Sequence, residues 1–412
     1  MKPFFSIVIP TRNRPDFLKY SLKSIQQQKF NDFEVIVSDN SDNHDEVISI
    51  VEEMKDPRFK VVCTPSVLRM SENFNYGLSH ATGSYISVIA DKTLLLAGAL
   101  KRVHKTLSKD PTIDVINWLS DWYSFKDEGN SWEGFYHTQQ DFHKPLIYST
   151  KKELKFRLSF LVKRSELKRR YFRGQIYYGF YSSRLIQKIK KKSGKLFHDL
   201  SPDYTSLILG FLYSAKSCDI GMPLSMMFVT NLSNGNKGQN NTEEARKYIS
   251  ESLDCSFEEF LEHLPFSPFY EAITNTIVYD FIHIIQMTKN NYLKKHINYN
   301  NLSLRILEEI QDRYPLSYQK IILEKDPSAK LLKGIGLRKF FNKVSFMLSE
   351  FNLKEIQDRF FMKFSGFVDT SGWYSQKQKQ RNAYFAQPCS DPMEGLEYGH
   401  NHYRKFSVLD YK

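Results

Sequence analysis

The sequence predicts an α/β fold: a mostly parallel, Rossmann-like sheet flanked by helices, followed by a mainly α-helical C-terminal extension. Over the first 120 residues, short apolar runs rich in β-branched residues alternate with segments whose apolar residues recur every three or four positions. From about residue 242 the pattern turns helical. Strand and helix alternating at this spacing indicate a parallel sheet. We therefore expect one domain over residues 1–240, with halves 1–120 and 121–240, and an extension over 241–412.

The first 63 residues supply the first three strands of that sheet and the two helices that connect them. A polar turn over residues 11–15 separates the first strand from the first helix. Pro10 closes the strand, and Pro15 ends the turn. That helix carries an apolar face of Phe17, Leu18, Leu22 and Ile25. In order, the predicted elements are a strand Phe4–Ile9, a helix from Asp16, a strand Phe33–Val37, a helix Asp45–Met54 and a strand Phe59–Cys63.

The run Ser84–Leu100 forms the fourth strand and its exit. A helix beginning after Met70 precedes it, and the apolar run breaks at Asp91-Lys92-Thr93 before resuming with helical spacing. Charged and hydroxyl side chains at the carboxyl end of such a strand lie where open α/β sheets bind their ligands. Taken alone, the tripeptide favours the simpler interpretation of an ordinary strand-to-loop exit with a solvated Asp and Lys, so the preceding segments must decide.

Parallel strands place their polar exits at one edge of the sheet. We therefore expect five side chains to gather there: Thr11, Arg14, Asp39, Asp42 and Asp91.

Three segments together resemble the nucleotide-binding half of family 2 glycosyltransferases, which have the GT-A fold. They are FSIVIPTRNRPDFLKYSLKSIQQQ, FEVIVSDNSDN and MSENFNYGLSHATGSYISVIAD. Their order and spacing agree with the family, strongly over residues 3–105 and more weakly to about residue 240. The resemblance is specific because it rests on all three segments and not on one motif.

The resemblance implies that the chain binds a nucleotide-sugar donor. Thr11 and Arg14 match the family's first turn, and Asp39 matches the acid that reads the base. A carboxylate accepts the N3–H of uracil or thymine, so the donor is expected to be UDP-linked. Arg69 is a second basic group suited to a diphosphate, although a solvated surface arginine is the alternative for both arginines. Asp42 either contacts the ribose or caps the next helix.

The tripeptide Asp91-Lys92-Thr93 departs from the family's acidic D-x-D motif, which binds Mg²⁺ or Mn²⁺. One carboxylate and one hydroxyl are a weak protein contribution to such a site. Three hypotheses follow. Asp91 and Thr93 hold a metal largely through water and phosphates; or Lys92 replaces the metal beside the leaving diphosphate; or the domain has lost catalysis and kept binding.

In the family, an acid about 100 residues beyond the metal motif serves as catalytic base, and Asp203 matches it in spacing and context. It would take the proton of the acceptor hydroxyl, and the sugar would be transferred with inversion. Capping the helix after Pro202 is the alternative role. Asp199 is the reserve candidate, and His198 is either a metal ligand or a loop histidine.

Composition favours anionic partners, since 58 Lys and Arg against 46 Asp and Glu give a net charge of +12. The basic run 151–195 indicates either helices with a solvated face or attachment to anionic lipid. Without a nucleic-acid-binding motif, we expect no nucleic-acid partner. The four cysteines form no C-x-x-C pair, and neither a signal peptide nor a transmembrane run is evident. We expect a cytoplasmic protein, at the inner face of the membrane if it meets one.

Together these observations predict an inverting glycosyltransferase that moves a sugar to a glycan or lipid-linked acceptor in surface polysaccharide biosynthesis. The alternative is a catalytically degenerate GT-A-like binding or scaffold protein of the same pathway. The oligomeric state is left open.

Overall fold

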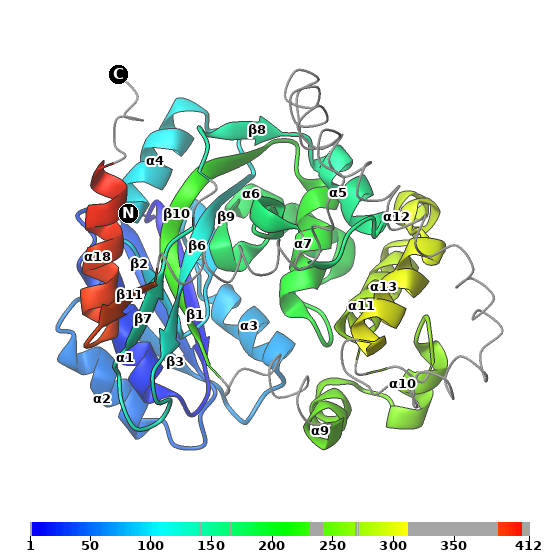
Figure 1. The fold of residues 1–412 in the computed structure, drawn as a ribbon, viewed down its shortest axis with the longest axis horizontal. Helices are drawn as coiled ribbons and strands as arrows, with labels where there is room; N and C mark the ends of the chain where they lie inside the picture. Colours follow the sequence, from blue (N-terminus) through cyan, green and yellow to red (C-terminus); the bar gives the residue numbers. More distant parts are fainter. Residues whose placement is uncertain are drawn as a thin grey trace, which may run out of the picture.

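The computed structural model describes most of the chain, namely residues 2–139, 142–164, 167–230, 242–267, 270, 272–311 and 386–405. An eleven-stranded mixed sheet runs through it, with the main strand order β11-β7-β6-β9-β4-β1-β2-β3. Helices cover both faces of this sheet (Figure 1). The predicted α/β class, with helices flanking the sheet and a helical C-terminal region, is confirmed.

The parallel part of the sheet lies in the first half of the chain. Its four strands, in spatial order, are β3 (Phe59–Cys63), β2 (Phe33–Asp39), β1 (Phe5–Thr11) and β4 (Tyr85–Val88). Neighbouring strands in this set pair in parallel, so their carboxyl ends meet at one edge. Every residue of β1 and β2 is buried, as expected for strands covered on both faces.

Successive side chains of β1 alternate between two layers of helices. Phe5, Ile7 and Ile9 pack with α1 (Pro15–Gln26), α2 (Asp45–Glu53) and α4 (Ala99–Lys109). Val8 belongs to the opposite core, with α3 (Met70–Ser79), α6 (Ser183–Ser193) and α7 (Pro202–Tyr213). The period of two along a strand thus explains why this sheet carries a hydrophobic core on each side.

Antiparallel pairs extend the sheet in the second half. β9 (Gly179–Ser182) lies between β4 and β6 (Val115–Phe125), and β6 pairs in parallel with the long β10 (Ser217–Val229). The shorter strands are β5 (Thr93–Leu95), β7 (Gly134–His137) and β8 (Leu146–Tyr148). β5 corrects one expectation: after Lys92 the chain forms a strand paired with β10 before α4 begins at Ala99.

The helical region packs on the α7 side of the sheet (Figure 1). It consists of α9 (Thr242–Ser252), α10 (Phe257–His263), α11 (Ile273–Thr288), α12 (Asn291–His296) and α13 (Tyr299–Gln311), and α5 (Thr150–Leu158) lies beside it. Within the described ranges, no helix has the length and apolar character needed to span a membrane. The part of the expected helical extension over residues 312–385 lies outside the described residues.

The C-terminal residues return to the sheet. β11 (Ala386–Cys389) pairs antiparallel with β7, and α18 (Pro392–Lys405) packs against β7 and α1. Figure 1 shows α18, in red, on the sheet side of the molecule, away from the yellow helices α11 and α13. Tyr403 of α18 donates a hydrogen bond to buried Asp121 of β6, at 2.8 Å from each carboxylate oxygen. Residues 386–405 of the C-terminal extension therefore form a strand and a helix that belong to the sheet side of the molecule.

Candidate functional site at the carboxyl ends of β1, β2 and β4

The polar exits of three neighbouring strands meet around Asp91. Thr11, the last residue of β1, is the register partner of Asp39 in β2. Its Oγ1 donates a hydrogen bond of 2.9 Å to Oδ2 of Asp91. The guanidinium Nε of Arg14 lies 3.1 Å from the same oxygen. The structure thus joins three of the predicted site residues through a single carboxylate oxygen.

The turn after β1 is held in place by the turn after β2. Asn13 has a positive φ of 54°, which an asparagine tolerates, and its backbone N–H donates to Ser41 Oγ at 2.9 Å. Its side chain exchanges hydrogen bonds with Asp42, of 2.8 Å to Oδ2 and 3.1 Å from the backbone N–H. Asp42 therefore joins the two turns. Pro15 then starts α1 and fixes the direction in which Arg14 leaves the turn.

Asp39 is fully buried, and both its oxygens have protein partners. Oδ1 accepts the backbone N–H of Ser41 at 3.0 Å, and Oδ2 lies 2.6 Å from His44 Nδ1. Each carboxylate oxygen can accept a second hydrogen bond, so this arrangement leaves acceptor capacity for a base. His44 was missed in the sequence because it precedes α2 without a recognisable motif.

Arg69 precedes α3 and forms an ion pair with exposed Asp254, which lies between α9 and α10. Among the described residues, Arg69 therefore pairs with an acid of the helical region, whereas Arg14 pairs with Asp91 at the strand exits.

The tripeptide forms a tight turn between β4 and β5. The backbone N–H of Thr93 donates to Ala90 O at 2.9 Å, and Thr93 then enters β5 with its side chain buried. Burial raises the pKa of Asp91, although Arg14 and Thr11 favour its charged form. Burial also lowers the pKa of Lys92 to about 8, and the neighbouring Arg14 lowers it too, while Asp91 opposes this. Two cations therefore crowd around one buried carboxylate.

The side chains at this corner are a poor fit to a divalent metal ion. Asp91 Oδ1 is buried and has no hydrogen-bond partner within the described residues, so one ligand atom is free. Oδ2, however, is already bound by Thr11 and Arg14, and Lys92 brings a second positive charge. A hard cation requires several oxygen ligands and is repelled by adjacent cations.

Asp203 lies in the first turn of α7, directly after Pro202. Burial raises its pKa to about 6, against the opposing effects of Arg164 and of the backbone N–H groups of Asp203 and Tyr204. The interaction of the Asp203 carboxylate with backbone N–H groups in the first turn of α7 agrees with a role in capping that helix. A raised pKa close to neutrality agrees equally with a general base.

Tyr178 connects α7, the helix of Asp203, to the strands beside the Asp91 corner. It ends a short 3-10 helix, Ile176–Tyr178, that packs against α7. The Tyr178 hydroxyl lies 3.4 Å from Met227 Sδ, and Met227 is the register partner of Thr93.

The other candidates of the same loop are engaged by the protein. His198 is buried, its Nε2 lies 3.0 Å from the carbonyl oxygen of Lys195, and burial lowers its pKa to about 4. Asp199 is bonded to His283 of α11. Burial would raise the pKa of Asp199, but this bond holds it below its usual value.

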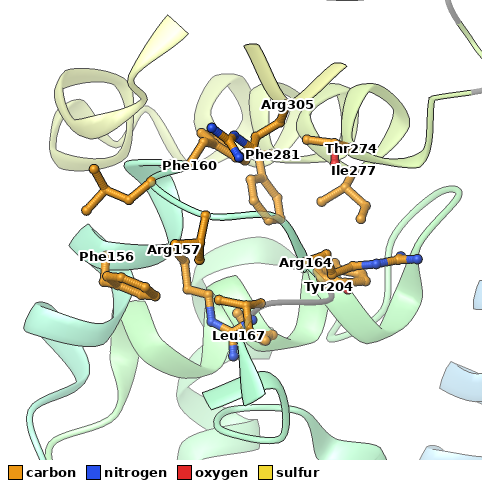
Figure 2. Close-up of a pocket in the computed structure, with 13 residues that line it drawn as sticks. Phe156, Arg157, Phe160, Arg164, Leu167, Tyr204, Thr274, Ile277, Phe281 and Arg305 are labelled. Atoms are coloured by element: carbon orange, nitrogen blue, oxygen red, sulfur yellow. The ribbon is translucent and has the colours of Figure 1, made fainter. Parts of the chain in front are cut away.

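A small pocket of about 60 Å³ lies against α7, and its wall includes Tyr204, the residue after Asp203. Figure 2 shows Arg157, Arg164 and Arg305 around it, together with the phenyl rings of Phe160 and Phe281. The remaining lining is mainly apolar and comes from α5, the segment that follows it, α7 and α11. The pocket therefore combines an apolar interior with cationic groups.

Residues 6–164 match the family model described as Glycosyl transferase family 2. This segment is a family 2 glycosyltransferase domain. It contains every predicted donor-site residue, from Thr11 to Thr93, whereas Asp203 lies beyond its end.

Two curated relatives and one solved structure illustrate the similarity. The chain is 37% identical over 101 residues to GalNAc(5)-diNAcBac-PP-undecaprenol beta-1,3-glucosyltransferase of Campylobacter jejuni, covering 24% of this chain and 32% of the relative. It is 29% identical over 172 residues to an uncharacterized glycosyltransferase of Methanocaldococcus jannaschii, covering 41% and 58%. A structure of S. aureus TarS with UDP-GlcNAc aligns at 14% identity and a TM-score of 0.44, covering 83% and 89%. The chain thus spans about a third and somewhat over half of the two curated relatives.

Proposed function

We propose that this protein is an inverting glycosyltransferase that moves a sugar from a UDP-linked donor to a glycan or lipid-linked acceptor in surface polysaccharide biosynthesis. The observation that carries the proposal is the convergence of Thr11, Arg14 and Asp91 beside Asp39, within a family 2 glycosyltransferase domain.

Asp39 would accept the N3–H of uracil with the lone pairs that Ser41 and His44 leave available. Arg14 and Lys92 would lie against the diphosphate and stabilise the negative charge that grows on it as the glycosidic bond breaks. Because both are fixed cations, we propose that transfer requires no divalent metal. Arg69 would join them only after leaving Asp254.

Asp203 would act as the general base. The acceptor hydroxyl oxygen attacks the anomeric carbon, its proton passes to the Asp203 carboxylate, and the bond to the diphosphate breaks on the opposite face. The nucleoside diphosphate leaves with the electron pair of that bond, which gives inversion.

The pocket that Tyr204 lines on α7 supports a charged, partly apolar acceptor. Its volume accommodates only part of such a molecule, and its arginines favour an anionic group next to a hydrocarbon portion. The exposed lysines at the end of α6, Lys191, Lys192 and Lys195, would favour an anionic membrane surface. We propose that the protein works at the cytoplasmic face of such a membrane.

A panel of nucleotide sugars tests the proposal, with turnover measured as release of nucleoside diphosphate in the presence of lipid-linked glycan extracts. We expect turnover with a UDP-sugar, unchanged by EDTA. Donor binding without turnover for any acceptor would instead support the degenerate binding protein, whose main support is the departure from the acidic motif at Lys92. Absence of both binding and turnover would overturn both functions.

A further inference from the structure

Three side chains with different ligand chemistry meet beside the nucleotide corner. They are the carboxylate of Asp39, the imidazole of His44 and the thiol of Cys63, and one ligand atom of each lies within 4.8 Å of the others. Asp39 ends β2 and Cys63 ends β3, and the two are register partners. His44 Nδ1 is 2.6 Å from Asp39 Oδ2. Oxygen, nitrogen and sulfur donors are thus brought together by adjacent strands and the start of a helix.

The backbone around this cluster is firmly held. The N–H of Thr64, the residue after Cys63, donates to Asp39 O at 2.9 Å, continuing the pairing of the two strands. Asn40 then links both strand exits: its Oδ1 accepts from Thr64 Oγ1 at 2.9 Å and from the Leu68 N–H at 2.8 Å, and its Nδ2 donates to Leu68 O at 2.8 Å. The relative backbone positions of Asp39 and Cys63 are therefore fixed by the fold, which holds the ligand atoms of the cluster within 4.8 Å of one another.

We propose that Asp39, His44 and Cys63 form a binding site for a zinc-class divalent ion. Zinc binds through the same three donor types, and three protein ligands leave its fourth tetrahedral position open to water or an inhibitor. A thiolate and a carboxylate balance the two positive charges of the ion. Mg²⁺, which prefers oxygen ligands, is disfavoured by the sulfur and the nitrogen. The site is separate from the Asp91 corner, with which it shares no ligand.

The position of the site gives it a consequence that rests on the proposed function. Asp39 is both a ligand of the ion and the acceptor proposed for the base of the donor. Because the ion would take lone pairs of the Asp39 carboxylate and its positive charge would weaken that carboxylate as an acceptor for the N3–H of uracil, we expect the ion and the nucleotide to compete. Zinc would then inhibit this protein by occupying the base site, without a role in the chemistry.

Cobalt substitution tests the site directly on the full chain, after treatment with EDTA under a phosphine reductant. Co²⁺ bound by a thiolate gives a sulfur-to-cobalt charge-transfer absorption in the near ultraviolet, which a site of oxygen and nitrogen lacks. We expect this absorption to saturate at one Co²⁺ per chain and to disappear when Zn²⁺ is added. Cys63→Ser should abolish this absorption. It should also weaken Zn²⁺ binding by about 100-fold, because losing even a residue that only hydrogen-bonds to a metal ligand costs up to about that much affinity. Cys255→Ser is the matched control, since Cys255 is also a partly exposed free cysteine.

Two outcomes would overturn the site: no thiolate absorption in the native chain, or equal Zn²⁺ affinity in native protein and Cys63→Ser. Calorimetric UDP binding separates this result from the proposed function. If UDP binds and Zn²⁺ weakens it in native protein but not in Cys63→Ser, both proposals gain support. If the cobalt absorption appears but UDP does not bind at all, the metal site stands and the donor assignment fails. If UDP binds equally well to metal-loaded and metal-free protein, the competition is wrong.

Discussion

The carboxylate of Asp280, on α11, accepts the backbone N–H of Ser201 at 2.7 Å, in the residue that caps α7. A second hydrogen bond joins Asp280 to the N–H of Leu200 at 3.4 Å. Asp280 is fully buried. The helical region thus orients the start of the helix that carries Asp203, two residues further on.

Replacing Asp280 by Asn should therefore impair the proposed transfer without affecting the donor site. An amide has one acceptor oxygen where the carboxylate has two, so its NH2 group must face either the Leu200 N–H or the Ser201 N–H as donor to donor. This opposition displaces Asp203, and we expect kcat to fall about tenfold. Steady-state kinetics together with UDP calorimetry measure this, and the Kd for UDP should stay unchanged. Thr276→Ala on the same helix is the control, since its hydroxyl bonds only within α11. Equal losses in kcat and UDP affinity would contradict a positioning role.

The pH profile should show the ionisation of Asp203. Burial raises the pKa of this carboxyl to about 6, and a base must be deprotonated to accept the acceptor proton. The value of kcat/KM should hence rise with pH up to about 6 and fall tenfold per unit below it. Asp203→Asn should lower kcat by about 100-fold or more and remove this limb. Asp199→Asn, in the loop just before α7, is the control and should retain the acidic limb of the pH profile. An unshifted acidic limb in Asp203→Asn would exclude Asp203 as the group that titrates.

Lys92→Met tests the fixed-cation hypothesis. Removing the ammonium leaves the diphosphate with Arg14 alone, so we expect UDP affinity to fall about tenfold, the cost of one charge-assisted contact. Isothermal titration with and without Mn²⁺ or EDTA measures it. The matched control is Lys126→Met, whose ammonium lies in an exposed pair with Glu133. If UDP binding in native protein strengthened markedly with Mn²⁺, the metal hypothesis for Asp91 and Thr93 would replace this one.

Tyr403→Phe should release the C-terminal helix. Tyr403 donates its hydroxyl to the carboxylate of Asp121, which is buried and also bound by Tyr136 at 2.5 Å. Loss of a hydrogen bond to such a group costs about 1.5–3 kcal/mol. Hydrogen exchange should accelerate over residues 386–405 and much less in β1. Tyr398→Phe, on the same helix, should have little effect because the structure gives Tyr398 ring contacts but no hydrogen bond through its hydroxyl. Equal exchange in the two variants would argue against this bond as the anchor.

Asp121 also makes the attachment of this helix sensitive to pH. Burial raises the pKa of Asp121 to about 7. The protonated form is therefore favoured in the folded state, and the stability it contributes is present below about pH 4 and declines as pH rises towards 7. Exchange over residues 386–405 should accelerate across that interval in native protein.

The part of the fold that could be predicted from the sequence rests on local patterns. The continuous apolar run Phe33–Val37 indicates a strand buried on both faces. Parallel pairing of the first two strands then places their polar exits, Thr11 and Asp39, side by side. The Asp91 corner was predictable for the same reason: its members follow strands whose order is fixed by short connections. The ion pair between Asp91 and Arg14 confirms that these strand exits meet, while the role of these residues in donor binding stays a prediction.

What could not be predicted depends on contacts between distant segments. Nothing near Arg69 indicates Asp254, and nothing near Ser201 indicates Asp280, because the tertiary fold brings each partner from the helical region, far away in the sequence. His44 is a histidine before a helix, and it becomes informative only when β3 brings Cys63 alongside. β11 is four residues long and contains a proline, so its strand character comes from pairing with β7.

The pairing of β11 with β7 also has a consequence for how the protein is made. Tyr403 follows its partner Asp121 by 282 residues, so translation must pass through the helical region and reach β11 before β7 acquires its outer neighbour. Until then the nascent chain presents an unpaired strand edge, the kind of surface on which other chains can pair. Slow synthesis, or a ribosome stalled anywhere in the helical region, would prolong that exposure. We therefore expect premature termination products of this protein to aggregate even when their glycosyltransferase segment is intact.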